Sequence, residues 1–257
     1  PAGADSRLGE SADLTPEPGM ALYGHGRDFT PDGTIVVTAW SVYAGRGVRR
    51  DHLVAVDTAT GERRVLAADS EHDFGGPAVS PDGRSVVAVR DFPGGEGPHG
   101  RAPEATLWLV DLATGEGRDL LAGYDLWPRD YAWTADSSAV LFAADDQGRR
   151  PVFRVEAATG ALVRVTADDG GYSDLNPAPA GTGLFALRDS WDEPPTPVRI
   201  DDATGAAGPQ HPVRLSAPEE PLEVPGALTE VAAEADDGMR IRSWLVLLRR
   251  DSAVHYE

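Results

Sequence analysis

Two β-turn signatures repeat in phase along this chain of 257 residues, at a spacing of about 50 residues. The first is Pro-Asp-Gly, which has two intact and two degenerate copies: Pro31-Asp32-Gly33, Pro81-Asp82-Gly83, Ala135-Asp136-Ser137 and Pro179-Ala180-Gly181. The second ends in Ala-Thr-Gly and begins at Asp57, Asp111, Glu156 and Asp201, in steps of 54, 45 and 45 residues. A period of about 40 to 50 residues with two turns per unit is typical of a β-propeller blade. We therefore predict an all-β fold, a partial β-propeller of about four blades, each of four antiparallel strands.

The segments between the turns have the length and pattern of strands. In the second repeat, residues 85–89 form a β-branched run that is typical of a strand buried on both faces. The second and third strands are joined by a short turn at 145–148 in the third repeat, but by longer connections, 41–51 and 91–105, in the first two. We predict four blades within residues 21–216 and a strand of a preceding blade near residues 13–15.

Residues 228–248 depart from the repeat. Polar and apolar residues alternate on both sides of the turn residues Asp237-Gly238. This pattern predicts a β-hairpin with no partner farther along the chain. We therefore divide the chain into blades over 1–222 and a linker with an opening hairpin over 223–257. Residues 248–257 match no motif and suggest truncation or a frameshift.

Composition excludes several classes of function. The net charge of −19 argues against binding to nucleic acids or to anionic membranes, and no apolar run reaches the roughly 18 residues that span a membrane. All 23 basic residues are Arg, which rules out a Lys nucleophile, and the absence of Cys rules out disulfides and thiolate chemistry. The N-terminus has no basic, apolar leader. We expect a cytoplasmic protein without a cofactor or a metal ion.

The blades resemble the propeller of prolyl-oligopeptidase-like serine peptidases, especially the acylaminoacyl-peptidase branch. Ser80-Pro81-Asp82-Gly83 and Asp111-Leu112-Ala113-Thr114-Gly115 carry the blade pattern, which TolB-like propellers share. The more specific feature is the order in which a propeller is followed by Glu230-Val231, Asp236-Asp237-Gly238 and the segment from Ile241 to Val246. In that family a hairpin of this kind opens the α/β-hydrolase domain. The resemblance implies more blades before this segment and a catalytic domain after it.

The chain contains no complete catalytic motif. A serine hydrolase of this type needs its nucleophile in G-x-S-x-G, which does not occur here. The nearest segment, Gly171-Tyr172-Ser173-Asp174, is predicted to be a turn between blades. The histidines are scattered without metal-binding spacing: His25, His52, His72, His99, His211 and His255. We assign no catalytic or metal-binding residue, so whether this chain belongs to an enzyme stays open.

Two features are candidates for substrate contact. Trp127 and Arg129 lead into the first strand of the third blade and offer an aromatic wall and a carboxylate clamp. Alternatively, Trp127 packs between blades and Arg129 pairs with Asp130. The loop 91–104, rich in Gly and Pro, either faces a hydrolase domain or is a disordered surface loop. The tryptophans within strands are predicted to be core residues: Trp40, Trp108, Trp133 and Trp244.

These observations favour the substrate-gating propeller of a peptidase that acts on short peptides, with its hydrolase domain as partner and outside this chain. The alternative is a non-catalytic, TolB-like binding propeller. A third interpretation is the product of a decayed gene, because an open propeller exposes apolar blade faces. The hairpin discriminates between the first two, since a pure propeller closes its ring without one.

Overall fold

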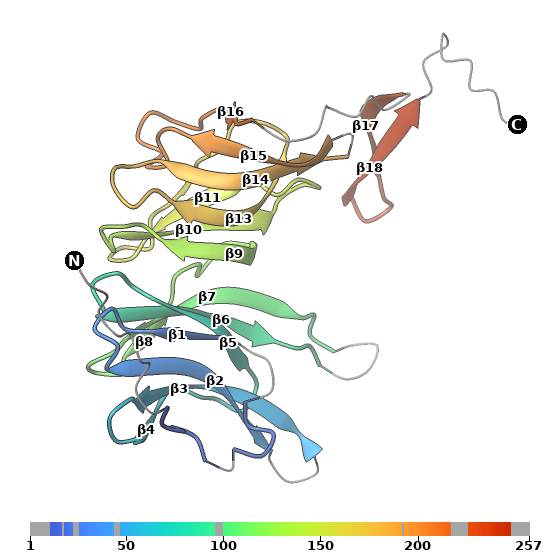
Figure 1. The fold of residues 1–257 in the computed structure, drawn as a ribbon. Helices are drawn as coiled ribbons and strands as arrows, with labels where there is room; N and C mark the ends of the chain where they lie inside the picture. The colour runs from blue at the N-terminus through green and yellow to red at the C-terminus, as the bar shows by residue number, and fades with distance from the viewer. Residues whose placement is uncertain are drawn as a thin grey trace, which may run out of the picture. The chain divides into compact units, whose positions relative to one another are not determined.

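The computed structural model describes residues 11–16, 18–22, 26–43, 47–95, 100–191, 193–216 and 226–247. Within these ranges the fold is all-β, without an α-helix, and consists of four four-stranded antiparallel sheets and one two-stranded hairpin (Figure 1). No helix in the described ranges is long and apolar enough to cross a membrane. In each four-stranded sheet the strands pair in chain order, which is the arrangement of a propeller blade. The prediction of a partial propeller of four blades is therefore confirmed.

The chain divides into two compact units, Pro1–Asp119 and Leu120–Glu257. Unit 1 holds two blades. The strands of blade 1 are β1 Arg27–Phe29, β2 Ile35–Tyr43, β3 Arg49–Asp57 and β4 Arg63–Ala67. Those of blade 2 are β5 Asp73–Val79, β6 Ser85–Phe92, β7 Glu104–Asp111 and β8 Gly117–Asp119. Strand β5 packs against blade 1, and residues of both blades form one buried cluster that includes Val37, Leu53, Phe74, Val86 and Val110.

Unit 2 holds the other two blades and the hairpin. Blade 3 contains β9 Trp127–Trp133, β10 Ala139–Asp145, β11 Val152–Glu156 and β12 Leu162–Arg164. Blade 4 contains β13 Gly171–Pro177, β14 Leu184–Ser190, β15 Glu193–Ile200 and β16 Val213–Arg214. The hairpin consists of β17 Ala227–Glu234 and β18 Arg240–Leu247, with Gly238 at φ 82° in its turn. The hairpin predicted around Asp237-Gly238 is thus confirmed as a local structure.

The repeated turns are stabilised by their own side chains. In blade 2 the Ser80 hydroxyl donates to Asp82 Oδ1 over 2.6 Å, and the Arg84 amide donates to the same oxygen over 3.0 Å. Thr30 with Asp32 and Thr134 with Asp136 repeat this arrangement. These hydrogen bonds lower the carboxyl pKa values, that of Asp136 to about 2. The Pro-Asp-Gly signature therefore marks a side-chain-stabilised β-turn between the first and second strands.

Three local expectations differ from the structure. Residues 13–15 do not form a strand; residues 14–16 are a bend, and Leu14 packs on the face of blade 1. The long connections of blades 1 and 2 are shorter than predicted, because paired strands continue to Tyr43↔Arg49 and to Phe92↔Glu104. Residues 171–174 begin β13 and are not a turn between blades. In the last two cases, hydrogen bonding between strands extends structure into segments of weak local preference.

A bulge recurs in the first strand of three blades. Pairing shifts register between Gly75 and Ala78 in β5, at Asp130 in β9, and between Ser173 and Asn176 in β13. Each bulge contains a residue in the left-handed region: Gly76, Asp130 and Asp174 have φ of 59°, 40° and 55°. Bulges of this kind bend a strand and increase its twist. Because the bulge recurs, the strained backbone at Asp130 belongs to the blade architecture and not to one site.

The tryptophans within strands are less buried than expected. Trp133 is buried, whereas Trp40, Trp108 and Trp244 are half-buried. Each of these three rings carries a guanidinium on its face: Arg63 over Trp40 at 4.4 Å, Arg90 over Trp108 at 4.7 Å and Arg149 over Trp244 at 5.1 Å. Trp40 and Trp108 still pack against the buried clusters of their blades, as predicted, and their outer faces form cation–π contacts. Trp244 belongs to no buried cluster, so the core prediction is wrong for this residue.

Candidate functional site

The two ends of each blade differ in character. Because the strands alternate in direction, both motif turns lie at one end of the sheet. The hairpins between second and third strands, and the segments that lead into first strands, lie at the other, which we call the loop end. The ion pairs of Arg101, Arg129 and Arg149, and the contacts of the β17–β18 hairpin, belong to loop ends. Binding residues of a repeat fold commonly gather on one such face.

Trp127 and Arg129 lie at the loop end of blade 3, within β9 itself and not before it. They line a shallow cavity of about 480 Å³ together with Asp125, Asp145, Asp146 and Gln147. Trp127 is 41% exposed. Arg129 Nε lies 3.3 Å from Asp145 Oδ2, so its carboxylate partner is the residue across the hairpin and not Asp130. The structure brings the two predicted residues together on one cavity, and their role in substrate contact stays a prediction.

The turn between β10 and β11 connects this cavity to the hairpin. Gln147 and Gly148 have φ of 53° and 79°, as in a type I′ turn, which matches the twist of the flanking strands. Gln147 lines the cavity. A Cβ at Gly148 would lie 3.5 Å from the indole nitrogen of Trp244, so the backbone of the turn approaches β18 closely. One short turn is therefore shared between the candidate cavity and the docked hairpin.

Arg149, the last residue of that turn, holds the hairpin. Its Nη2 lies 3.3 Å from Glu230 Oε2, and its guanidinium lies over the Trp244 ring. On the blade side, Arg149 Nε lies 2.6 Å from Asp169 Oδ1. Arg242 Nη1 approaches the other oxygen of Glu230 at 3.3 Å. Since the Arg149 side chain is only 16% exposed, loss of its partners would leave a desolvated charge. The sequence contains no motif that predicts this contact between residues far apart in the chain.

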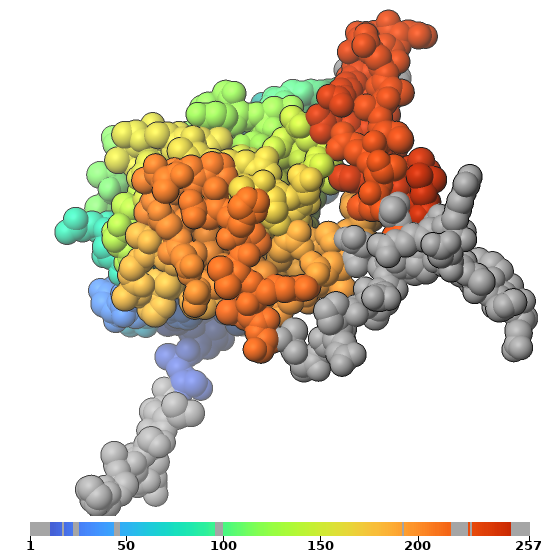
Figure 2. Space-filling view, turned by 90° about the horizontal axis from the view of Figure 1, so that it is seen from above, coloured from blue at the N-terminus to red at the C-terminus, as the bar shows by residue number. Residues whose placement is uncertain are grey.

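The hairpin presents two different faces. Glu230 and Trp244 are cross-strand partners on the face that contacts the blades, where Trp191 also lies 6.5 Å from the Trp244 ring. The opposite face carries four apolar side chains that are between 41% and 52% exposed: Val231, Ile241, Leu245 and Leu247. Figure 2 shows the hairpin projecting from the blades of unit 2. A ribbon of two strands with one apolar face open is typical of a surface that packs against further protein.

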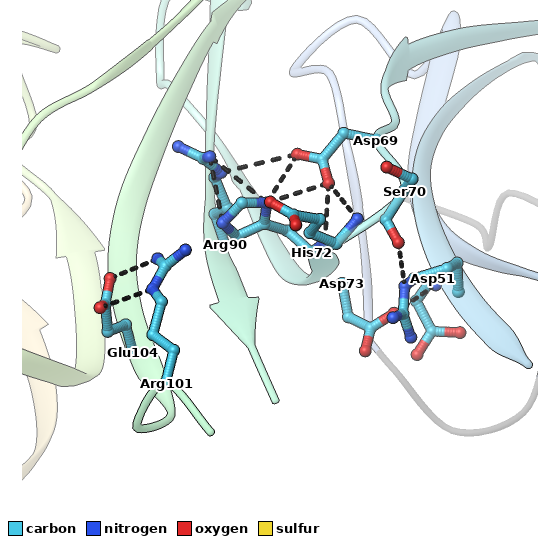
Figure 3. Close-up of polar contacts among 10 residues, drawn as sticks. Asp51, Asp69, Ser70, His72, Asp73, Arg90, Arg101 and Glu104 are labelled. Atoms are coloured by element: carbon cyan, nitrogen blue, oxygen red, sulfur yellow. Dashed lines mark hydrogen bonds and ion pairs between the residues drawn. The ribbon is translucent and has the colours of Figure 1, made fainter. Parts of the chain in front are cut away.

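The loop end of blade 2 contains a second polar cluster (Figure 3). Arg101 pairs with both oxygens of Glu104, at 2.9 and 2.7 Å, and lies over the Phe92 ring at 4.1 Å. Burial, together with the nearby Asp73 carboxylate, raises the pKa of Asp91. Within the predicted loop 91–104, residues 96–99 lie outside the described ranges. The described part therefore shows a loop whose base is fixed by ion pairing and ring contacts.

The sequence predicts no metal site and no nucleophile motif, and two observations bear on these predictions. Across the described ranges, no group of three His, Cys, Asp or Glu side chains is arranged to hold a metal ion. Ser173 lies in β13, opposite Leu187, and not on a strand-to-helix turn. His25, His99 and His255 lie outside the described residues.

The comparisons with known proteins support the fold. No family model matches the chain, and no curated protein matches it significantly. Among solved structures, TolB from Acinetobacter baumannii is similar over 86% of this chain and 51% of its own, with 19% identity and a TM-score of 0.50. Prolyl oligopeptidase B from Galerina marginata is similar over 87% of this chain and 30% of its own, with 15% identity and a TM-score of 0.57.

These similarities define a class of fold, a propeller of the kind seen in TolB and in prolyl oligopeptidases. The chain spans about half of the Acinetobacter TolB and less than a third of the Galerina peptidase. A second TolB, from Agrobacterium tumefaciens, is similar over 63% of its own length, with 18% identity and a TM-score of 0.50. At these levels of sequence identity, the comparisons support a similar fold and nothing about function.

Proposed function

We propose that this chain is the substrate-gating propeller portion of a prolyl-oligopeptidase-like serine peptidase, of the acylaminoacyl-peptidase type. Its substrates are short peptides, its working compartment is the cytoplasm, and its partner is a hydrolase domain that this sequence does not contain. The observation that carries the proposal is the docked hairpin. Its Glu230 and Trp244 are held by the blades, while its opposite face exposes four apolar side chains.

The free energy lost by leaving apolar side chains of the hairpin in water supports a further domain that packs on this face. Each buried apolar side chain contributes roughly 1.5–3 kcal/mol when it leaves water. Val231, Ile241, Leu245 and Leu247 lie on one face and are all about half exposed. A hydrolase domain that packs on this face would bury them together. Arg149 would then fix that domain relative to blades 3 and 4.

The position of the cavity supports the gating role. Trp127, Arg129 and Gln147 line it, and the turn that contains Gln147 contacts Trp244 of the hairpin. A domain seated on the hairpin would place its substrate entrance beside this cavity. There Trp127 offers an exposed aromatic surface to an apolar side chain of a peptide, and Arg129 a hydrogen-bond donor to a peptide carbonyl or carboxylate.

The first experiment isolates the natural product of the gene with antibodies against this chain and treats it with a fluorophosphonate probe. We expect covalent labelling of the polypeptide that carries these blades, and hydrolysis of short N-acylated peptides but not of a folded protein. The purified 257-residue chain should neither be labelled nor hydrolyse peptides, because it lacks the nucleophile. Absence of labelling in the natural product would overturn the peptidase proposal.

The second experiment tests the cavity in the labelled protein. We expect Trp127→Ala to raise KM for a short peptide severalfold with little change in kcat, because the contact would serve binding and not bond cleavage. Tyr124→Ala is the matched control, since Tyr124 is an exposed aromatic residue nearby that does not line the cavity. If the two variants change KM equally, Trp127 does not contact the substrate.

The second candidate function is a non-catalytic binding propeller of the TolB-like kind. The similarity to TolB, over 86% of this chain, supports it, as does the lack of a nucleophile in the sequence. In that case the exposed face of the hairpin would pack against a protein partner that is not a hydrolase. The natural product would then resist the fluorophosphonate and would be isolated in a stable protein complex.

A further inference from the structure

Blade 1 has a cavity on the face opposite to its contact with blade 2. Successive side chains of a strand point to opposite faces. Val37 and Ala55 belong to the buried cluster that blade 1 shares with blade 2, whereas Val36 and Val56 belong to a separate cluster against which Leu14 packs. A cavity of about 430 Å³ lies on this second face. Sites for small molecules range over roughly 300–1,000 Å³, so the cavity is large enough for such a ligand.

The wall of the cavity is mostly apolar. The sheet and the segment before β1 both contribute to it, through the side chains of Leu14, Leu22, Phe29, Val36, Ala39 and Val56. Thr38 also lines the cavity, but its hydroxyl donates to the carbonyl of Gly26 over 3.2 Å. A polar group in contact with these apolar side chains would lose its hydrogen bonds to water without replacement. A ligand that fills the cavity therefore needs an apolar body.

Arg27 is the one charged residue among those that line the cavity. Within the described ranges its guanidinium forms no ion pair, hydrogen bond or ring contact, although the chain has a net charge of −19. The adjacent carboxylate of Asp28 faces blade 2, where it accepts a hydrogen bond from the Val79 amide over 2.7 Å. Arg63, by contrast, lies over the Trp40 ring. The cavity thus combines an apolar wall with an unpaired cation.

This combination favours one class of ligand. A carboxylate accepts two parallel N–H bonds from a guanidinium, which is among the strongest polar contacts in proteins. A neutral apolar molecule would leave the cation of Arg27 without a partner, and an organic cation would be repelled by it. A polyanion is disfavoured because the cavity offers a single cation and the whole chain is strongly acidic.

We infer that this cavity binds an amphipathic monocarboxylate, with its apolar body against Phe29, Val36 and Val56 and its carboxylate on Arg27. The site is built from residues of unit 1 alone. The cavity of blade 3 and the β17–β18 hairpin, on which the proposed peptidase function rests, belong to unit 2. The inference therefore stands or fails independently of the proposed function.

Binding of two probes to the 257-residue chain tests the inference. Isothermal titration calorimetry compares decanoate with decyltrimethylammonium, which has the same apolar chain and the opposite charge, both below their micelle concentrations. We expect decanoate to bind at one site with a Kd below about 1 mM, and the cation to bind at least about tenfold more weakly. In methyl NMR spectra, decanoate should shift the resonances of Val36 and Val56 but not those of Val86 and Val110, which lie in the other cluster.

A pair of variants tests the role of Arg27. Arg27→Met should weaken decanoate binding about tenfold, the order of effect of one charge-assisted hydrogen bond, and should abolish the preference for the anionic probe. Arg84→Met is the matched control, because it removes the same charge from unit 1 at a residue that does not line the cavity. It should bind decanoate like the wild-type protein.

Three results would overturn the inference. The first is equal affinity of the wild-type chain for the two probes, and the second is decanoate binding that Arg27→Met does not weaken. The third is the absence of shifts at Val36 and Val56 in the wild-type protein, which does not depend on the folding of a variant. That result would assign this face of blade 1 to packing against further protein.

Discussion

Blades 2 and 4 both pair an arginine of the second strand with an aspartate that precedes the first strand, but a different third side chain takes part in each blade. Arg90 on β6 stands opposite Phe74, and Arg188 on β14 stands opposite Tyr172, at equivalent places in the two sheets. Each arginine reaches back to an aspartate in the segment before the first strand. In blade 4, Arg188 Nε lies 2.6 Å from Asp168 Oδ2, whereas in blade 2 Arg90 Nε lies 3.8 Å from Asp69 Oδ2.

The third group in each cluster explains the difference. In blade 4 the Tyr172 hydroxyl donates to Asp168 over 2.6 Å, so the aspartate is satisfied by direct partners. In blade 2 the corresponding aromatic residue is Phe74, which has no hydroxyl, and His72 fills the gap between acid and base. The comparison teaches that the repeat fixes where an Asp–Arg pair forms. The third side chain decides whether the aspartate and the arginine approach each other directly, as in blade 4, or with a ring between them, as in blade 2.

The largest expected difference between the blades comes from removing the arginines. Arg188→Met would leave Asp168 with an uncompensated, mostly buried charge, and we expect a loss of about 3 kcal/mol in the free energy of unfolding. Arg90→Met should cost about 1 kcal/mol, because the Asp69 carboxylate keeps its hydrogen bond from His72. Urea unfolding followed by circular dichroism measures both values. If Arg90→Met lowers the free energy of unfolding as much as Arg188→Met or more, the proposed difference between the two blades is wrong.

A smaller effect should come from the tyrosine. Tyr172 is fully buried, and burial together with the hydrogen bond to Asp168 raises its pKa. Tyr172→Phe removes one donor to a charged acceptor and should destabilise the protein by about 1.5 kcal/mol without a change in packing. Thermal unfolding of this variant beside Phe185→Leu, a control on the exposed surface of the same blade, gives the measurement. No loss in Tyr172→Phe would show that Arg188 alone satisfies Asp168.

The smallest effect concerns the motif turns. Ala178, Ala180 and Gly183 of blade 4 occupy the places of Ser80, Asp82 and Ser85, because the bonds from Ala178 N to Gly183 O and from Ser80 N to Ser85 O are equivalent. We expect the double substitution Ala178→Ser/Ala180→Asp to stabilise blade 4 by roughly 0.5 kcal/mol at neutral pH, by restoring the side-chain bonds of the turn.

The pH dependence of that gain has a definite sign. The hydrogen bond from Ser80, followed by that from the Arg84 amide, lowers the pKa of Asp82 below its ordinary 3.8. A group with a depressed folded-state pKa stabilises the fold above its unfolded pKa, and the gain is lost as pH falls through the folded value. Melting temperatures at about pH 7 and about pH 2 should therefore differ from wild type only at the higher pH. A gain that persists in acid would have another cause.

Much of the fold could be predicted because its signals are local. Pro81-Asp82-Gly83 and its relatives determine turns through the φ preference of Pro and Gly and the hydrogen bonds of Asp, and these depend on neighbours within five residues. The apolar runs between them predict strands for the same reason. The ends of the strands were less predictable, because Tyr43 and Glu104 are held by cross-strand bonding to Arg49 and Phe92 and not by their own preference.

The candidate site could be predicted only in part. The sequence indicated Trp127 and Arg129 as candidates because an aromatic residue lies close to a cation, and both residues line one cavity in the structure. Their partner Asp145 was missed, because it lies across a hairpin in a register that the sequence does not determine. Arg149 and His72 gave no signal, since one Arg among 23 basic residues and one His among six have nothing distinctive around them.

The sequence by itself determined the repeat, the turns, the strands and the hairpin, together with the absence of lysine and cysteine chemistry. These properties follow from composition and from interactions over a few residues. Only the tertiary structure decided that Arg149 holds Glu230, 81 residues away, and that His72 stands between Asp69 and Arg90. Charges pair over a few ångströms in space, so their partners are set by how strands and blades pack and not by position along the chain.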